Sequence, residues 1–214
     1  MKKSEQAAAS KKRILDAAVR LFAEKGYKHS GVQEISEASG VSRGSIFWHF
    51  GSKEGLLFAV VDHCFSAWEN EVLVPLLGEG TGPESIGQVV RSHVAFVKSS
   101  PEVGRLFFVM LFEGLAAQPK LLEKYRELHQ RFRGYGRSWI QNAMAAGQLR
   151  ADVDPEAAAS AIVGALGGAH YQWLMDPERV DIEQVDAALA KVFERGLAPA
   201  QSSRSSSRPT VSGT

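Results

Sequence analysis

A short segment near the N-terminus carries side chains that would be wasteful on an ordinary surface but that suit a polyanionic partner. Phe47, Trp48 and His49 are consecutive, Gly44 falls inside a short helical pattern, and Lys53 falls in the first turn of the next helix. Glycine in a helix costs about 1 kcal/mol relative to alanine, and a helix N-terminus disfavours a cation. A phosphate backbone would attract Lys53 and accept hydrogen bonds from Trp48 and His49. The missing side chain at Gly44 would let that helix approach base edges closely.

Two short helices are expected to position these side chains. Ser30 and Gln33 have capping-box spacing and open the first helix, which ends at Gly40. Ser42 caps the second, which runs to about His49. The turn between them has helix-turn-helix length. Apolar residues are spaced to bury between the two helices and against a preceding helix that ends at Gly26: Val32, Ile35, Val41, Ile46 and Phe50, facing Ile14, Ala17, Ala18, Leu21 and Phe22.

The string GVSRGSIFWHFGSKEGLL (residues 40–57) resembles the DNA-binding signature of the TetR/AcrR family of transcription regulators. The resemblance covers the first four helices strongly and the rest of the chain only in layout. It implies that the third helix enters the major groove, with Arg43 and Gln33 in positions that read bases. It also implies phosphate contacts from Trp48, His49 and Lys53.

Two positions depart from the family pattern. Phe47 stands where the family usually has tyrosine, so only an apolar contact, for instance with a thymine methyl, remains. Gly31 stands where threonine or serine is common, which weakens the phosphate contact expected beside Ser30. Three alternatives stay open: Gln33 closes a capping box with Ser30, Arg43 is a solvated surface residue, and Phe47 belongs to the core. The expected DNA-contacting set is Ser30, Gln33, Ser42, Arg43, Gly44, Ser45, Phe47, Trp48, His49 and Lys53.

The charge distribution supports a polyanionic partner for the N-terminal part. Residues 1–55 carry 10 Lys or Arg against 6 Asp or Glu, whereas residues 56–197 carry 13 against 18. A single cysteine, Cys64, excludes a disulfide framework and favours a reducing cytoplasm. No apolar stretch follows the initial Met-Lys-Lys, so no secretory signal is expected. The longest apolar run, Leu106 to Phe112, is too short to span a bilayer, so no membrane partner is expected.

The periodicity of the chain predicts an all-α fold of about nine helices. Later helices begin near Gly82-Pro83, Ser100-Pro101 and Asp154-Pro155, each with proline at or near the first helical position. A long helix is expected from about Pro119 to Ala146, followed by two at about 155–175 and 181–195. The predicted organisation is a three-helix DNA-binding domain (1–54), a helical-bundle domain for ligand binding and dimerisation (55–197), and a disordered tail (198–214) that is rich in Ser and poor in apolar residues.

Large apolar residues are frequent in the body of the chain. A packed core explains many of them, but a ligand site in a helical bundle would have the same lining with a few polar groups for orientation. The family resemblance implies such a site for a small apolar or aromatic ligand. Its expected residues are Phe65, Trp68, Phe96, Arg105, Phe107, Phe108, Phe112, Trp139 and Trp173, with further polar candidates at His63, Arg91, His93, Glu113 and His129.

Three glycines fall inside the penultimate helix, where each is unfavourable unless helices approach closely. The resemblance implies a homodimer that packs the last two helices against their copies. The expected interface residues are Gly164, Gly167, Gly168, Val185, Leu189 and Val192. Close packing inside one subunit is the alternative explanation for the glycines.

The residues give no support for an enzyme, a metal site or a cofactor. His63 and Cys64 are adjacent, so on a helix they point about 100° apart, and no His or Cys pair has metal-ligand spacing. The resemblance implies a ligand-responsive, DNA-binding transcription regulator, most commonly a repressor that a small apolar molecule releases from a palindromic operator. The alternatives are a helical small-molecule-binding protein that does not bind DNA, and an activator.

Overall fold

The computed structural model describes residues 3–74 and 84–199, and these residues form nine α-helices and a π-helical turn, with no strand. The elements are α1 (Lys3–His29), α2 (Val32–Ser39), α3 (Arg43–Phe50), α4 (Lys53–Trp68), the π-helical turn η1 (Glu69–Leu73), α5 (Glu84–Ser99), α6 (Pro101–Ala117), α7 (Pro119–Ala145), α8 (Pro155–Met175) and α9 (Ile182–Leu197). The predicted all-α class is confirmed.

Local sequence signals set most of the helix ends. The side chains of Ser42 and Ser52 accept hydrogen bonds from the backbone N–H groups of Ser45 and Gly55, which caps α3 and α4. Asp154 caps α8 in the same way, ahead of Pro155. Glycines with positive φ follow α2, α3 and α7 at Gly40, Gly51 and Gly147.

Gly26 interrupts α1 rather than ending it. Its backbone has φ 78° and ψ 163°, a conformation that is essentially restricted to glycine, and helical geometry resumes as far as His29. The sequence interpretation therefore placed the break correctly but missed the last turn. The predicted start at Gly82 and nearly all of the predicted disordered tail lie outside the described residues.

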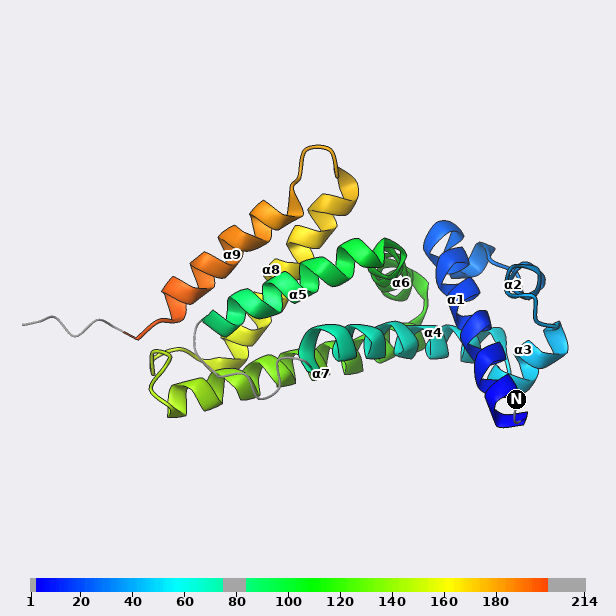
Figure 1. The fold of residues 1–214 in the computed structure, drawn as a ribbon, viewed down its shortest axis with the longest axis horizontal. Helices are drawn as coiled ribbons and strands as arrows, with labels where there is room; N and C mark the ends of the chain where they lie inside the picture. The colour runs from blue at the N-terminus through cyan, green and yellow to red at the C-terminus, as the bar shows by residue number, and fades with distance from the viewer. Residues whose placement is uncertain (1–2, 75–83, 200–214) are drawn as a thin grey trace, which may run out of the picture.

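Figure 1 shows α1, α2 and α3 grouped at one end of the molecule, with α4 running from this group into a body formed by α5–α9. Ile14, Phe22, Ile35 and Ile46 are fully buried or nearly so and lie in one hydrophobic cluster that continues through α4 into the body. A second cluster occupies the region where α5, α7, α8 and α9 meet, and it includes Ile140 and Ala159. The helical head thus shares one hydrophobic cluster with part of the body, and the rest of the body is built on the second.

In the part of the chain that the structure describes, no helix is long and apolar enough to cross a membrane.

Candidate DNA-binding surface and ligand-binding body

The recognition-helix candidate α3 turns its large aromatic residues outward. Ile46 is buried, whereas 42% of Phe47 and 74% of Trp48 is exposed. The alternative that Phe47 belongs to the core is therefore wrong. Arg43 and Gly44 are also exposed at the start of α3, and a Cβ built on Gly44 would meet nothing closer than 3.9 Å. This end of α3 is open to a partner.

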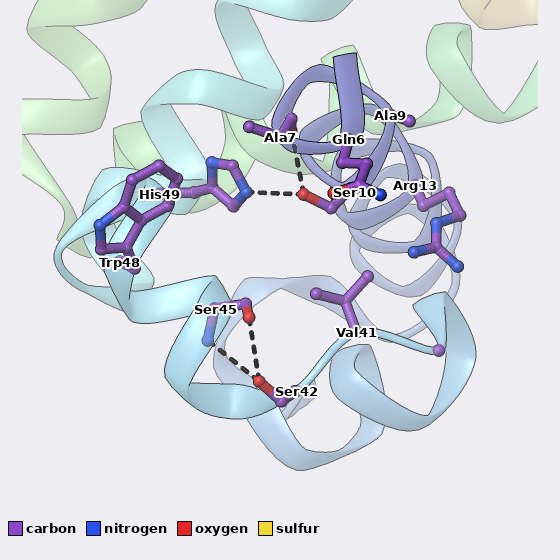
Figure 2. A pocket seen from close by; sticks show the side chains of 11 residues that line it. Gln6, Ala7, Ala9, Ser10, Arg13, Val41, Ser42, Ser45, Trp48 and His49 are labelled. Carbon is purple, nitrogen blue, oxygen red and sulfur yellow. Dashed lines mark hydrogen bonds between the residues drawn. The ribbon is translucent and has the colours of Figure 1, made fainter. Parts of the chain in front are cut away.

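A groove of about 710 Å³ separates the start of α3 from the N-terminal half of α1. Figure 2 shows Ser42 and Ser45 on one side of it and Ser10 and Arg13 of α1 on the other. The Ser10 hydroxyl donates to the Ala7 carbonyl oxygen at 2.9 Å and lies 2.8 Å from Nε2 of His49. Because that hydroxyl proton is used, the His49 Nε2–H is the donor, and only Nδ1 of this ring is left for another partner.

Three polar side chains of this groove were missed by the sequence interpretation. Gln6, Ser10 and Arg13 lie on α1 at spacings of four and three positions, so they share one helix face. That spacing of polar residues was a visible signal. What the sequence did not show is that this face lies across from α3.

Lys53 begins α4 and lies partly buried against the end of α1. Its Nζ is 4.4 Å from the centre of the Tyr27 ring, a cation–π geometry. Burial lowers the pKa of Lys53, and the nearby carboxylates of Glu113 and Glu34 oppose that shift. The ammonium group is thus held at the junction of α1 and α4, beyond the C-terminal end of α3.

Ser30 is a correction to the expected DNA-contacting set. Its side chain is fully buried, and its hydroxyl lies 2.8 Å from the Gly26 carbonyl oxygen and 3.0 Å from that of Leu21. The hydroxyl donates to backbone at the α1 break and does not reach the surface.

The capping box at the start of α2 is displaced by one residue from the prediction. The N-cap is Gly31, whose N–H donates to the Glu34 carboxylate at 2.8 Å, so the alternative role of Gln33 with Ser30 is wrong. Gln33 is exposed, and its amide donates to Glu37 at 2.7 Å. Because the N-cap is Gly31 and not Ser30, the side chain that accepts the N-cap N–H is that of Glu34 and not that of the predicted Gln33.

The expected ligand-binding residues do not converge on one site. Phe65 and Phe96 are buried in the first hydrophobic cluster, and Trp68, Phe107 and Trp173 pack against it. Trp139 belongs to the second cluster instead. Arg105 is exposed and Phe112 is 54% exposed beside the Tyr171 ring, so these two face away from the interior. The expected roles of Trp139, Arg105 and Phe112 in one ligand site are therefore corrected. The rotation of α6 and α7 about their axes turns these three side chains away from the first cluster.

Among the polar candidates of the body, His93 turns into the aromatic core. Its Nδ1 accepts a hydrogen bond from Nε1–H of Trp68 at 3.0 Å. By contrast, Arg91 is exposed and His63 lies 3.7 Å from Asp16 at the surface. Glu113 accepts the backbone N–H of Tyr27 at 3.1 Å and therefore joins α6 to the last turn of α1.

The remaining two candidates take other roles. His129 is half-buried against the rings of Tyr125 and Phe132, and burial, followed by the charge of Arg133, lowers its pKa. Phe108 lies between the rings of His170 and Tyr171 on the side of α8, at centroid distances of 5.3 and 5.7 Å. The sequence interpretation did not single out His170, which is 6% exposed.

The outer face of α8 is open. Cβ atoms built on Gly164, Gly167 and Gly168 would meet nothing within 4 Å, so the alternative that these glycines serve close packing inside one subunit is wrong. Large apolar residues near this face are also exposed: Tyr171 40%, Met175 60%, Phe112 54% and, on α9, Val192 64%. Val185 and Leu189 are half-buried.

The lone thiol is placed unfavourably for nucleophilic chemistry. Cys64 is 1% exposed, and burial raises its pKa to about 12, with smaller contributions from Glu102 and Asp16. Within residues 3–74 and 84–199, no group of three or more His, Cys, Asp or Glu is arranged to hold a metal ion.

Comparison with known proteins finds one family that matches the N-terminal part of the chain and one that matches most of the rest. A family described as bacterial regulatory proteins, tetR family, matches residues 14–60, and one described as tetracyclin repressor-like, C-terminal domain, matches residues 81–192. The transcriptional regulator AcrR of Shigella flexneri is 27% identical over 197 residues, covering 86% of each chain. The transcriptional regulator RutR of Escherichia coli K12 is 32% identical over 126 residues, 58% of this chain and 56% of that protein.

Solved structures show the same architecture. The transcriptional regulator FadR of Bacillus subtilis, crystallised with stearoyl-CoA, superposes with a TM-score of 0.76 at 20% identity, covering 87% of this chain and 98% of that one. A TetR regulator from Chloroflexus aurantiacus gives 0.76 at 23% identity, covering 91% and 98%. The chain belongs to the tetR family of bacterial regulatory proteins, and it is a DNA-binding transcription regulator.

Proposed function

We propose that this regulator is a cytoplasmic homodimer that represses transcription from a palindromic operator and is released by a small apolar molecule bound in its body. The observation that carries the proposal is the path of α4. This helix begins at Lys53, just after the C-terminal end of α3, and ends at Trp68, whose indole N–H is hydrogen-bonded to His93 of α5. One rigid element therefore joins the DNA-facing surface to the aromatic interior.

A second contact ties the body to the DNA-facing head. The Glu113 carboxylate on α6 holds the backbone N–H of Tyr27, and the Tyr27 ring in turn lies under the Lys53 ammonium. A ligand that moves α4 or α6 would change the separation of the two α3 helices in a dimer. The operator fixes its half-site spacing, roughly 34–36 Å or a multiple of it, so a small change in separation weakens binding.

One relative of known structure supports the ligand-binding part of the proposal. The similar B. subtilis FadR was crystallised with stearoyl-CoA, a molecule with a long apolar chain. A coupling free energy of about 1–3 kcal/mol is typical of allosteric proteins in general, and between ligand and DNA it would correspond to roughly 5- to 150-fold weaker binding.

The test is fluorescence anisotropy with a labelled duplex from the DNA flanking the protein's own gene. We expect salt-sensitive binding that is much tighter than binding to a scrambled duplex of equal length, and reversal by a ligand found in a thermal-shift screen. Calorimetry with and without operator should then show the same loss of affinity for the ligand as for the DNA. Equal binding to operator and scrambled duplex at every salt concentration would exclude the proposal.

A further inference from the structure

Two buried imidazole edges lie in the aromatic interior of the body without hydrogen-bond partners. Because the His93 Nδ1 accepts from Trp68, a neutral His93 ring carries its proton on Nε2. That Nε2 is buried, and no partner for it exists among the described residues. The interior therefore contains an N–H donor that points at no acceptor.

His170 supplies the second edge, from α8. Only 6% of this residue is exposed, and its Nε2 is also buried and unpartnered in the described part of the chain. Its ring centre is 5.8 Å from that of His93, at an interplanar angle of 77°. The ring lies against α6 at Gly104, where a Cβ would come within 2.4 Å of Nε2, so only glycine leaves room for it.

The surroundings of the two imidazoles are aromatic. Phe108 and Trp173 have ring centres 5.3 and 5.9 Å from that of His170. The ring centres of Trp68 and Phe132 are 4.4 Å apart. Burial lowers the pKa of both histidines to about 4, with an added effect of His170 on His93, so both rings are neutral at pH 7. Native proteins rarely leave buried polar atoms unpaired, because each lost hydrogen bond is destabilising.

We propose that His93 and His170 bind the hydroxyl oxygen of a neutral ring compound, a phenol or a cyclic alcohol, inside the body. A hydroxyl accepts one hydrogen bond and donates another, so it can accept from His93 Nε2–H and donate to the Nε2 of His170. A hydrocarbon would leave the Nε2 atoms of both histidines unpaired. A carboxylate would be buried beside two neutral imidazoles, neither of which supplies a positive charge to balance it. The aromatic rings would hold the body of the ligand.

This assignment rests on the proposed function and adds to it the chemical class of the ligand. It also connects the ligand to α4, because the His93 ring that would donate to the ligand hydroxyl also accepts the hydrogen bond from Trp68.

The experiment is calorimetry of the full-length protein with three probes of the same shape: 4-ethylphenol, ethylbenzene and 4-ethylbenzoate. We expect 4-ethylphenol to bind at least tenfold more tightly than either of the others. His170→Phe and His93→Phe should each reduce that preference to less than threefold while ethylbenzene binds as before or better. The matched control His29→Phe, at an exposed position in the DNA-facing head, should leave all three affinities unchanged.

Nitrogen NMR of labelled histidine gives a readout that a purely structural role would not move. The Nε2 resonances of His93 and His170 should shift with 4-ethylphenol and not with ethylbenzene. The proposal is overturned if 4-ethylphenol does not bind, if the phenol and the hydrocarbon bind alike, if the benzoate binds best, or if both variants keep the preference. A phenol that binds as described but leaves operator binding unchanged would support this site and contradict the ligand-release function, so the two failures are distinguishable.

Discussion

At the scale of single residues, the side chains proposed to face DNA divide into those that already have partners within the protein and those left open. Gln33 and His49 have hydrogen-bond partners in Glu37 and Ser10. Arg43 and Trp48 are exposed at the surface of α3. Base reading is therefore expected chiefly from Arg43, and a phosphate contact from the indole N–H of Trp48.

Arg43→Ala is expected to weaken operator binding by about 1–3 kcal/mol and to relax the preference at one base position in each half-site, because a base-edge contact is lost. Anisotropy against operators substituted at each position measures both effects. Arg179→Ala, an exposed arginine in the turn between α8 and α9, is the control and should bind like the wild type. A uniform loss across all operator variants would mean that Arg43 contacts phosphate instead.

Lys53→Ala is expected to weaken binding to operator and random duplex by the same factor, because a phosphate contact carries no sequence information. The slope of log affinity against log salt should fall by about one unit. Lys98→Ala removes a lysine paired with Glu183 in the body and should change neither quantity. An unchanged salt slope in Lys53→Ala would limit this residue to its contact with Tyr27.

At the scale of elements, the break in α1 joins the head to the body. Gly26 permits the positive φ there, and a Cβ at this position would come within 2.6 Å of the Glu113 carboxylate that holds Tyr27. The glycine therefore serves both the backbone geometry and the contact between α1 and α6.

Gly26→Ala is expected to lower the free energy of unfolding by about 1–3 kcal/mol, because alanine is strained in this conformation and crowds Glu113. Gly134→Ala in the middle of α7, where a Cβ meets nothing within 4 Å, should raise it by about 0.5–1 kcal/mol. Urea unfolding of both variants measures the contrast. Equal effects of the two alanines would show that Gly26 carries no strain.

At the scale of the whole molecule, the open glycine face of α8 predicts where a second copy packs. Gly168→Arg would place a long charged side chain on that face, and light scattering should show monomers or aggregate, with specific operator binding lost. Ser138→Arg, at an exposed position of α7, should stay dimeric. A Gly168→Arg protein that dimerises and binds normally would place the interface elsewhere.

A buried carboxylate on α9 should make the stability of the molecule depend on pH. Asp186 is 1% exposed, its oxygens have no hydrogen-bond partner in the described chain, and burial raises its pKa to about 6. The folded state then binds a proton that the unfolded state releases above pH ~4, so this group's contribution falls as pH rises from about 4 to 6. His93 and His170 act in the opposite direction, since their lowered pKa values favour the fold as pH rises.

Asp186→Asn removes the first contribution and leaves the second. The variant should therefore gain stability over the wild type by about 2–3 kcal/mol at pH 7.5 and by much less at pH 4. Thermal unfolding of both proteins at the two pH values checks this, and a gain that is equal at both would mean that folding does not raise the pKa of Asp186.

The sequence by itself determined the features that depend on near neighbours along the chain. The caps at Ser42 and Ser52, the glycine ends at Gly40 and Gly147, and the outward set on α3 follow from residues within a few positions of one another. These interactions are local, so the pattern of residue types is enough to predict the helices and the helix-turn-helix, and with them the family.

Only the tertiary structure decided which face of each helix meets which neighbour. Trp139 and Phe107 have the same aromatic character in the sequence, yet they pack in different clusters. Arg105 turns to the surface, whereas His170 lies against Gly104 of α6 beside His93, a residue 77 positions earlier in the numbering of the chain. Periodicity gives each helix an apolar stripe, but the rotation of the helix and its partner across the core come from packing between distant segments, and that packing places the two imidazoles together.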